Sequence, residues 1–284
     1  MIWPALAAAR RRDATARLPF FIDGHQVGSV ARADLAALHA WPQWLRVDDS
    51  QVVLNASDRD AALATINAGL REQGLVRAWR DEPYAIVDLG SGQRLARTER
   101  AAARFWGTLT LGAHATGYVA GADGRPTHLW IARRSPHKAT DPGLLDNLIG
   151  GGVPDGQAPI ETLVREGWEE AGLGPQQMAA ARPGRVMRLH RDLAEGLQRE
   201  DLHSFDLPLP AGVTPHNQDG EVASFECLPL ALALERAAST QMTVDAALVT
   251  LDFVLRHDLL PSVQAVPLTA AMAVLTLRHP AQSP

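Results

Sequence analysis

Residues 150–174 constrain the structure of this chain most strongly. They read GGGVPDGQAPIETLVREGWEEAGLG, a glycine-rich loop followed by a run with helical periodicity. The loop lacks the GK[ST] ending of a P-loop, so we interpret it as a tight turn that places the helix. Apolar or small residues recur at helical spacing, and a glycine follows that can end a helix. These residues are Ile160, Leu163, Val164, Gly167 and Ala171, with Gly172 as the end. We predict a helix over 159–171 that buries this face.

Three carboxylates crowd into one turn of the predicted helix. Glu166, Glu169 and Glu170 stand at positions i, i+3 and i+4, where like charges repel one another, and the C-terminal end of the helix dipole adds to the cost. A hard divalent cation such as Mg²⁺ or Mn²⁺ prefers oxygen ligands and would compensate this repulsion. Arg165 can also pair with Glu161 or with a neighbouring glutamate. The simpler alternative is a solvated acidic helix face.

The spacing of these residues resembles the Nudix box, GX5EX7REUXEEXGU, in which U is a bulky aliphatic residue. The matching residues are Gly151, Arg165, Glu166, Glu169, Glu170, Gly172 and Leu173. Two positions depart from the pattern: Gln157 stands in place of the first glutamate, and Gly167 replaces an aliphatic residue. The helix glutamates themselves remain.

The resemblance implies an α/β/α sandwich with a mixed sheet and a hydrolase that cleaves a diphosphate linkage by attack of water on phosphorus. It implies that Glu166, Glu169 and Glu170 bind Mg²⁺ or Mn²⁺ and that Arg165 orients them. The proton of the attacking water is then taken by Glu169 or by a glutamate beyond the box. Glu221, in QDGEVASFECL, is the candidate in this sequence.

Further segments are similar to the Nudix part of fungal thiamine pyrophosphokinase. They are LWIARRSPHKATDPGLLDNLIGGG, GLQREDLHSFDLPLP and DGEV. This similarity implies hydrolysis of thiamine diphosphate, or of its oxidised analogues, to the monophosphate, with Arg133, Lys138 and Gly151 at the substrate. ADP-ribose or NADH as the substrate, and a non-catalytic Nudix-like cofactor sensor, remain alternatives. Isopentenyl diphosphate isomerases share a similar run but carry a cysteine in the segment corresponding to DNLIGG, and this chain has none there.

The 284 residues divide by pattern into an N-terminal α+β unit at 1–110, a Nudix domain at 111–255 and a helical tail at 256–284. In the first unit we predict a hairpin around 23–24, a helix at 32–40, a strand within 51–57, a helix at 58–74 capped by Ser57 and Asp60, extended structure at 76–89 and a helix at 97–105. Strands at 109–120 and 127–135 and a long helix within 242–259 follow. The N-terminal unit carries no recognisable chemistry, and it either shapes the substrate pocket or mediates a homodimer.

Composition limits the partners and the compartment. The net charge of −5 gives no overall basic surface, which argues against nucleic acid as the main partner. The single cysteine, Cys227, cannot form an intrachain disulfide, which fits a cytoplasmic protein. The apolar runs near the two ends fit neither a secretory signal nor a membrane span, and the one at 265–277 predicts a core or docking helix. No HExxH or GxSxG pattern is present, so zinc protease and serine hydrolase chemistries are excluded.

Overall fold

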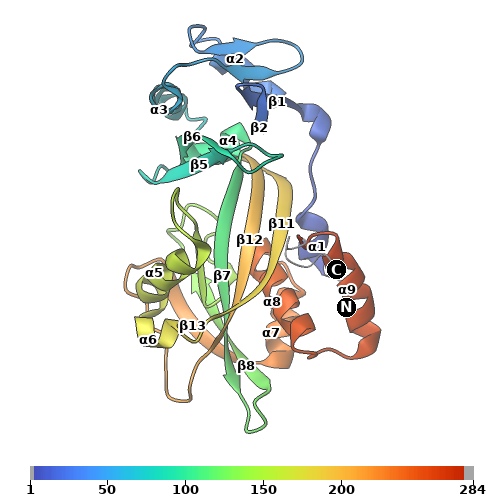
Figure 1. Ribbon diagram of the computed structural model, residues 1–284. Coiled ribbons are helices and arrows are strands. Elements are labelled where there is room, and N and C mark those ends of the chain that lie inside the picture. Colours follow the sequence, from blue (N-terminus) through green and yellow to red (C-terminus); the bar gives the residue numbers. More distant parts are fainter. Residues whose placement is uncertain (1–2, 278–284) are drawn as a thin grey trace.

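A computed structural model describes residues 3–277 and shows an N-terminal unit above a larger sheet that is covered by helices on both faces (Figure 1). In the N-terminal unit one sheet has the strand order β2-β1-β4-β3, and a separate hairpin pairs β5 with β6. The strands are β1 (Arg17–Ile22), β2 (His25–Ala31), β3 (Leu45–Val47), β4 (Val52–Leu54), β5 (Pro83–Val87) and β6 (Arg94–Glu99). The helical segments are η1 (Ala14–Ala16), η2 (Arg32–Asp34), α2 (Leu35–Leu38), α3 (Arg59–Glu72), η3 (Arg100–Ala102) and α4 (Ala103–Trp106).

The hairpin predicted around 23–24 is confirmed, because Asp23 and Gly24 both have positive φ angles, 49° and 80°, as a tight turn between β1 and β2 requires. Helix α3 is also confirmed, with Gly74 beyond its end at φ 74°. Its N-cap is Asp58, whose carboxylate accepts from the backbone N–H of Ala61, and the predicted capping by Ser57 is wrong.

The helix predicted at 97–105 is wrong over its first three residues. Residues up to Glu99 belong to β6, in which Ala96 and Thr98 are buried while Arg97 between them is exposed. This alternation has a period of two, and pairing with β5 outweighs the helix propensity of the segment. Helical structure begins only at Arg100 and ends at Gly107, which adopts the left-handed conformation.

The larger sheet has the strand order β11-β12-β7-β8-β13, with short strands β10 beside β7 and β9 beside β8. Its strands are β7 (Leu109–Ala120), β8 (Pro126–Arg134), β9 (Leu145–Asp146), β10 (Ile149–Gly152), β11 (Arg182–Leu193), β12 (Gly196–Pro208) and β13 (Val222–Pro229). Strands β7 and β12 run parallel and the other pairs are antiparallel, so the sheet is mixed. The predicted strands at 109–120 and 127–135 correspond to β7 and β8.

Helices cover the larger sheet on its two faces (Figure 1). They are α5 (Pro159–Ala171) and α6 (Pro175–Met178) on one face, and α7 (Leu230–Ala237) and α8 (Val244–Arg256) on the other. Each face has its own hydrophobic cluster, one containing Leu163 of α5 and the other Phe253 of α8. The predicted α/β/α sandwich with a mixed sheet is therefore confirmed.

The first and last described segments both pack against the larger sheet unit. Helix α1 (Pro4–Ala8) contacts α8, and the backbone N–H of His190 donates to Ala9 O. Helix α9 (Ser262–Ala273) buries Leu268 and Met272 in the same cluster, as expected for a core helix. The end of the predicted tail, 278–284, lies outside the described residues. None of the helices within 3–277 combines the length and hydrophobicity needed to span a bilayer.

Candidate functional site

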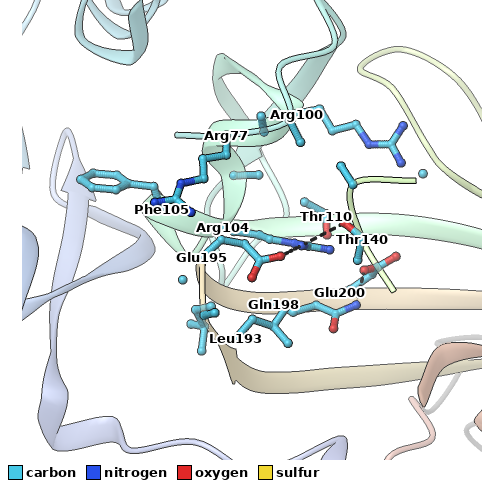
Figure 2. A pocket seen from close by; sticks show the side chains of 18 of the residues that line it. Arg77, Arg100, Arg104, Phe105, Thr110, Thr140, Leu193, Glu195, Gln198 and Glu200 are labelled. Carbon is cyan, nitrogen blue, oxygen red and sulfur yellow. Dashed lines mark hydrogen bonds and ion pairs between the residues drawn. The ribbon is translucent and has the colours of Figure 1, made fainter. Parts of the chain in front are cut away.

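A cleft of about 840 Å³ lies between the N-terminal unit and the larger sheet. From the N-terminal unit it is lined by residues that include Arg80, Tyr84, Arg100 and Arg104. From the sheet and its loops it is lined by residues that include Lys138, Gly150, Gly151, Glu200 and Glu221. Figure 2 shows Arg100 entering from the N-terminal unit, with Gln198 and Glu200 projecting from β12. The cleft is therefore walled by both units of the chain.

Helix α5 packs against β10, whose glycines line this cleft, and it has the predicted bounds, 159–171. Leu163, Gly167 and Ala171 are buried as predicted, whereas Ile160 is 41% exposed. Thr162 is buried instead, and its hydroxyl donates to Gln157 Oε1 at 3.0 Å. Gln157, one of the two residues that depart from the Nudix box, therefore stabilises the first turn of the helix. This contact explains how a neutral amide is accommodated there.

Two of the three helix glutamates are buried, although their charge favours solvent. Glu166 is 9% exposed and Glu170 is 5% exposed. The backbone N–H of Gly150 donates to Glu170 Oε2 at 2.9 Å, and a Cβ atom on Gly151 would overlap the Glu166 carboxylate. Gly151 thus lets the Glu166 carboxylate approach the backbone, and Gly150 binds Glu170 through its backbone N–H. Gly151 also lines the cleft, where we predicted it to meet substrate.

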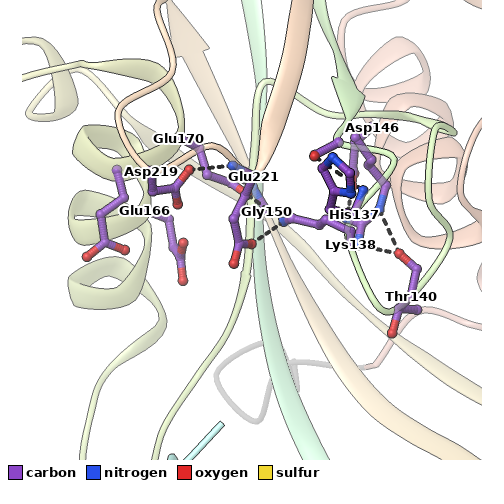
Figure 3. Close-up of polar contacts among 12 residues, drawn as sticks. His137, Lys138, Thr140, Asp146, Gly150, Glu166, Glu170, Asp219 and Glu221 are labelled. Atoms are coloured by element: carbon purple, nitrogen blue, oxygen red, sulfur yellow. Dashed lines mark hydrogen bonds and ion pairs between the residues drawn. The ribbon is translucent and has the colours of Figure 1, made fainter. Parts of the chain in front are cut away.

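Lys138 joins helix α5 to the loop before β13. Its Nζ atom lies 3.1 Å from Glu170 Oε1 and 2.6 Å from Glu221 Oε2, and its side chain is only 9% exposed. Arg80 of the N-terminal unit donates to the other oxygen of Glu221 at 2.9 Å. Burial alone would raise the pKa of Glu221, but the hydrogen bonds and charges of Lys138 and Arg80 lower it to about 2. Figure 3 shows Glu166, Glu170 and Glu221 on one side of Lys138.

Arg165 holds the other two helix carboxylates. It donates to Glu169 Oε2 at 2.7 Å and to Glu166 Oε1 at 2.9 Å, whereas Glu161 caps the helix by accepting from the N–H of Ala158. Burial, followed by the charge of Glu170, raises the pKa of Glu166 to about 7, although Arg165 opposes this shift. Burial also raises the pKa of Glu170 against the effect of Lys138. The nearby basic side chains therefore do not offset the effect of burial on the pKa values of Glu166 and Glu170.

The chemistry of this donor set suits a hard divalent cation, because desolvated carboxylate oxygens that repel one another are the ligands Mg²⁺ prefers. Among residues 3–277, however, no group of three or more His, Cys, Asp or Glu side chains converges closely enough to hold a metal ion. Glu169 is turned toward Arg165 and its side chain is 39% exposed. Ligation by all three helix glutamates would thus require Glu169 to leave Arg165.

The structure does not bring Arg133 into the cleft. Its guanidinium donates to Gly143 O at 2.9 Å and lies 3.9 Å from Glu226, and the side chain is 45% exposed. The neighbouring Arg134 lines the cleft and pairs with the buried Asp146 at 2.7 Å. Because successive residues of β8 alternate between the faces of the sheet, only one of the two arginines can point inward.

The end of the cleft around Gln198 is acidic. Gln198 Nε2 donates to Glu200 Oε2 at 2.8 Å and lies 3.2 Å from Asp245 Oδ2. Burial, followed by the charge of Asp245, raises the pKa of Glu200. A Cβ atom on Gly112 would overlap the Glu200 carboxylate, so the glycine is needed for this position. This end of the cleft can accept hydrogen bonds or bind a cation.

Several cleft residues were not predicted. Arg80, Tyr84 and Arg100 come from the N-terminal unit, in which the sequence shows no motif. Glu200 lies in GLQREDLHSFDLPLP, a segment noted for its family similarity in which no residue was given a role. The three residues of the N-terminal unit have no local signal, because each acquires its place only through contacts with distant parts of the chain.

The fold and the site together define an α/β/α domain in which a glutamate-bearing helix packs against a glycine strand beside a cleft. The family model described as the NUDIX domain matches residues 111–248, and the domain of unknown function DUF4743 matches residues 4–110. Residues 111–248 therefore form a Nudix domain, which follows the N-terminal DUF4743 domain.

Two plant relatives match most of the chain. It is 36% identical over 217 residues to Nudix hydrolase 20, chloroplastic, of Arabidopsis thaliana, covering 74% of this chain and 57% of that protein. It is 35% identical over 204 residues to Nudix hydrolase 24, chloroplastic, of the same plant, covering 72% and 55%. The chain thus spans little more than half the length of these relatives. A crystal structure of DR0079 from Deinococcus radiodurans is similar with 24% identity and a TM-score of 0.46, over 61% of this chain and 99% of that one.

Proposed function

We propose that this chain is a metal-dependent hydrolase that cleaves the diphosphate linkage of a small molecule. The observation that carries the proposal is the buried pair Glu166 and Glu170, which contacts the cleft-lining glycines Gly150 and Gly151, while the N-terminal unit lines the same cleft with arginines. Carboxylates on one side and guanidinium groups on the other suit a diphosphate bridged to the protein by a cation. The names of the two plant relatives support the same chemistry.

Mg²⁺ or Mn²⁺, when bound by Glu166, Glu169 and Glu170, would neutralise phosphate charge and lower the pKa of a bound water. Arg165 orients the carboxylates through its contacts with Glu166 and Glu169. Glu221 is held by Lys138 and Arg80, and the low pKa that results makes it a weak base. We therefore assign proton removal from water to Glu169, and to Glu221 the positioning of Lys138 beside the substrate.

For the substrate we propose thiamine diphosphate or one of its oxidised analogues. The acidic end of the cleft, with Glu200 and Asp245, suits an organic group that carries positive charge and an amino donor, as thiamine does. ADP-ribose and NADH are the competing substrates. Arg133, which lies outside the cleft, would meet substrate only after a rearrangement of its contact with Glu226. A cytoplasmic location and a homodimer remain predictions.

The test is product analysis after incubation of the purified protein with Mg²⁺ and thiamine diphosphate, ADP-ribose or NADH in parallel. We expect thiamine monophosphate and phosphate, and no product when EDTA is present. Glu226→Gln, at an exposed glutamate outside the cleft, serves as a control that should retain normal activity. Cleavage of a nucleotide alone would refute the thiamine assignment. Tight binding of any of the three compounds without turnover would instead support a cofactor sensor.

A further inference from the structure

The hairpin formed by β5 and β6 is fixed against the Nudix domain beside helix α5. The backbone N–H of Asp155, in the loop before α5, donates to Pro83 O at 2.8 Å. The side chain of Asp155 accepts from Arg94 of β6 in a bidentate pair, with a shortest distance of 2.7 Å. Residues that β5 presents to the cleft are therefore held in a defined position relative to the glutamate helix.

Tyr84 of β5 is such a residue, and its hydroxyl is buried without a partner. The residue is 4% exposed and lines the cleft, and within residues 3–277 its hydroxyl oxygen has no hydrogen-bond partner. Buried hydroxyls normally have one, since leaving water without compensation is unfavourable. Burial raises the pKa of Tyr84, so the hydroxyl stays protonated and is a donor. The unused donor indicates a ligand that supplies an acceptor.

Arg100 lies beside this hydroxyl. Its Cζ atom is 5.7 Å from the centre of the Tyr84 ring, and its NH1 group donates to Glu82 at 2.7 Å. A Cβ atom on Gly152 would overlap the Tyr84 hydroxyl and would come within 3.3 Å of the Arg100 guanidinium carbon. The hydroxyl and the guanidinium therefore meet at the glycine strand, next to the carboxylate of Glu166 that Gly151 accommodates.

We propose that Tyr84 and Arg100 bind an anionic oxygen of the substrate diphosphate, so that the N-terminal unit completes the active site. The proposal rests on the proposed hydrolysis of a diphosphate. A protonated hydroxyl and a guanidinium side by side form charge-assisted hydrogen bonds with a phosphate oxygen, the acceptor that Tyr84 lacks. Arg100 keeps its bond to Glu82 and has further N–H donors for the ligand.

The test compares Tyr84→Phe with Tyr118→Phe. Both variants lose one hydroxyl, but Tyr118 lies outside the cleft, with its ring 5.3 Å from that of Phe253. Binding of methylenediphosphonate, a diphosphate analogue that is not hydrolysed, is measured by calorimetry with Mg²⁺ present. Because a hydrogen bond to a charged group is strong, we expect Tyr84→Phe to raise Kd about tenfold or more and Tyr118→Phe to change it less than twofold.

Thermal unfolding separates binding from a structural role. Since the Tyr84 hydroxyl has no hydrogen-bond partner among the described residues, 3–277, Tyr84→Phe should unfold at a temperature no lower than the wild-type protein. A clearly lower unfolding temperature of Tyr84→Phe would overturn this inference. So would a Kd of Tyr84→Phe equal to that of the wild-type protein, provided that the wild-type protein hydrolyses its substrate. Either outcome would leave the proposed function standing. If the unchanged protein neither bound the analogue nor hydrolysed any diphosphate, both proposals would be wrong.

Discussion

Removal of the Lys138 charge should destabilise the protein through Glu170. The two side chains are 9% and 6% exposed, and their charged atoms lie 3.1 Å apart. Loss of one partner of a buried ion pair typically costs 3–5 kcal/mol, since the remaining charge is left without compensation. The backbone N–H of Gly150 still donates to Glu170 in the variant, so we expect Lys138→Met to cost about 3 kcal/mol, at the lower end of that range.

Urea unfolding at pH 7, followed by tryptophan fluorescence, measures this cost. In the double variant Lys138→Met, Glu170→Gln no charge remains at the pair. Its loss in free energy of unfolding should be smaller than the sum of the two single losses by at least about 1.5 kcal/mol. Arg97→Met removes an exposed pair with Asp60, with side chains 52% and 36% exposed, and should cost less than about 1 kcal/mol. A loss below about 1 kcal/mol for Lys138→Met, or simple additivity in the double variant, would contradict a stabilising role of the buried Lys138–Glu170 pair.

The same variant should have a characteristic pH dependence. Burial raises the pKa of Glu170 in the folded state, and Lys138, which lowers it, is absent from the variant. A carboxyl whose folded pKa lies above its unfolded value binds a proton preferentially in the folded state, so stability rises as pH falls toward the unfolded value. The deficit of Lys138→Met relative to the unchanged protein should therefore shrink between pH 7 and pH 5 in the same urea assay.

Three further predictions concern the helix glutamates, the glycine strand and a half-buried histidine. Glu169→Gln and Glu170→Gln should each lower the Mg²⁺-dependent rate at least tenfold while circular dichroism shows a folded protein; near-normal rates would remove them from the mechanism. Gly151→Ala should displace the adjacent helix carboxylate and lower kcat at least tenfold, whereas Gly174→Ala, where an added Cβ atom makes only an ordinary contact with Gln177 at 3.8 Å, should stay within twofold. Burial and nearby arginines lower the pKa of His190 to about 4. Acidification from pH 6.5 to 4 therefore protonates this histidine in the unfolded state first, which lowers the stability of the folded state. We expect a loss of roughly 1 kcal/mol, because the side chain is partly exposed. His190→Gln should abolish that part of the pH dependence in thermal unfolding, and an unchanged profile would contradict the assignment.

Local patterns predicted the Nudix domain better than the N-terminal unit. Helix α5 begins and ends where its apolar spacing and Gly172 indicate, and the long strands β7 and β8 follow their turn signals. In the N-terminal unit, residues 97–99 form a strand because Thr98 pairs with Tyr84 of β5, a contact that helix propensity does not reveal. Prediction failed where pairing with a distant segment outweighed local preference.

The burial of Glu166 and Glu170 also could not be predicted from the sequence. Helical spacing predicts that Glu166 and Glu170 share a side of the helix, but it does not show that this side meets a strand made of glycines. The absence of a side chain at Gly151 leaves the space that the Glu166 carboxylate occupies, and Glu170 accepts a hydrogen bond from the backbone N–H of Gly150. The raised pKa of Glu166, about 7, follows from this packing and not from the sequence spacing alone.

The amino-acid pattern alone predicts the helix, the order of its glutamates and the kind of ligand they suit, because residues three and four apart on a helix are neighbours whatever surrounds them. Tertiary packing is needed to show which basic side chain pairs with each carboxylate and which residues form the other wall of the cleft. Arg80 and Glu221 are 141 positions apart, and Tyr84 reaches the glycine strand only because β5 is fixed to the loop before α5. Such contacts depend on how separate elements pack, and no local pattern encodes them.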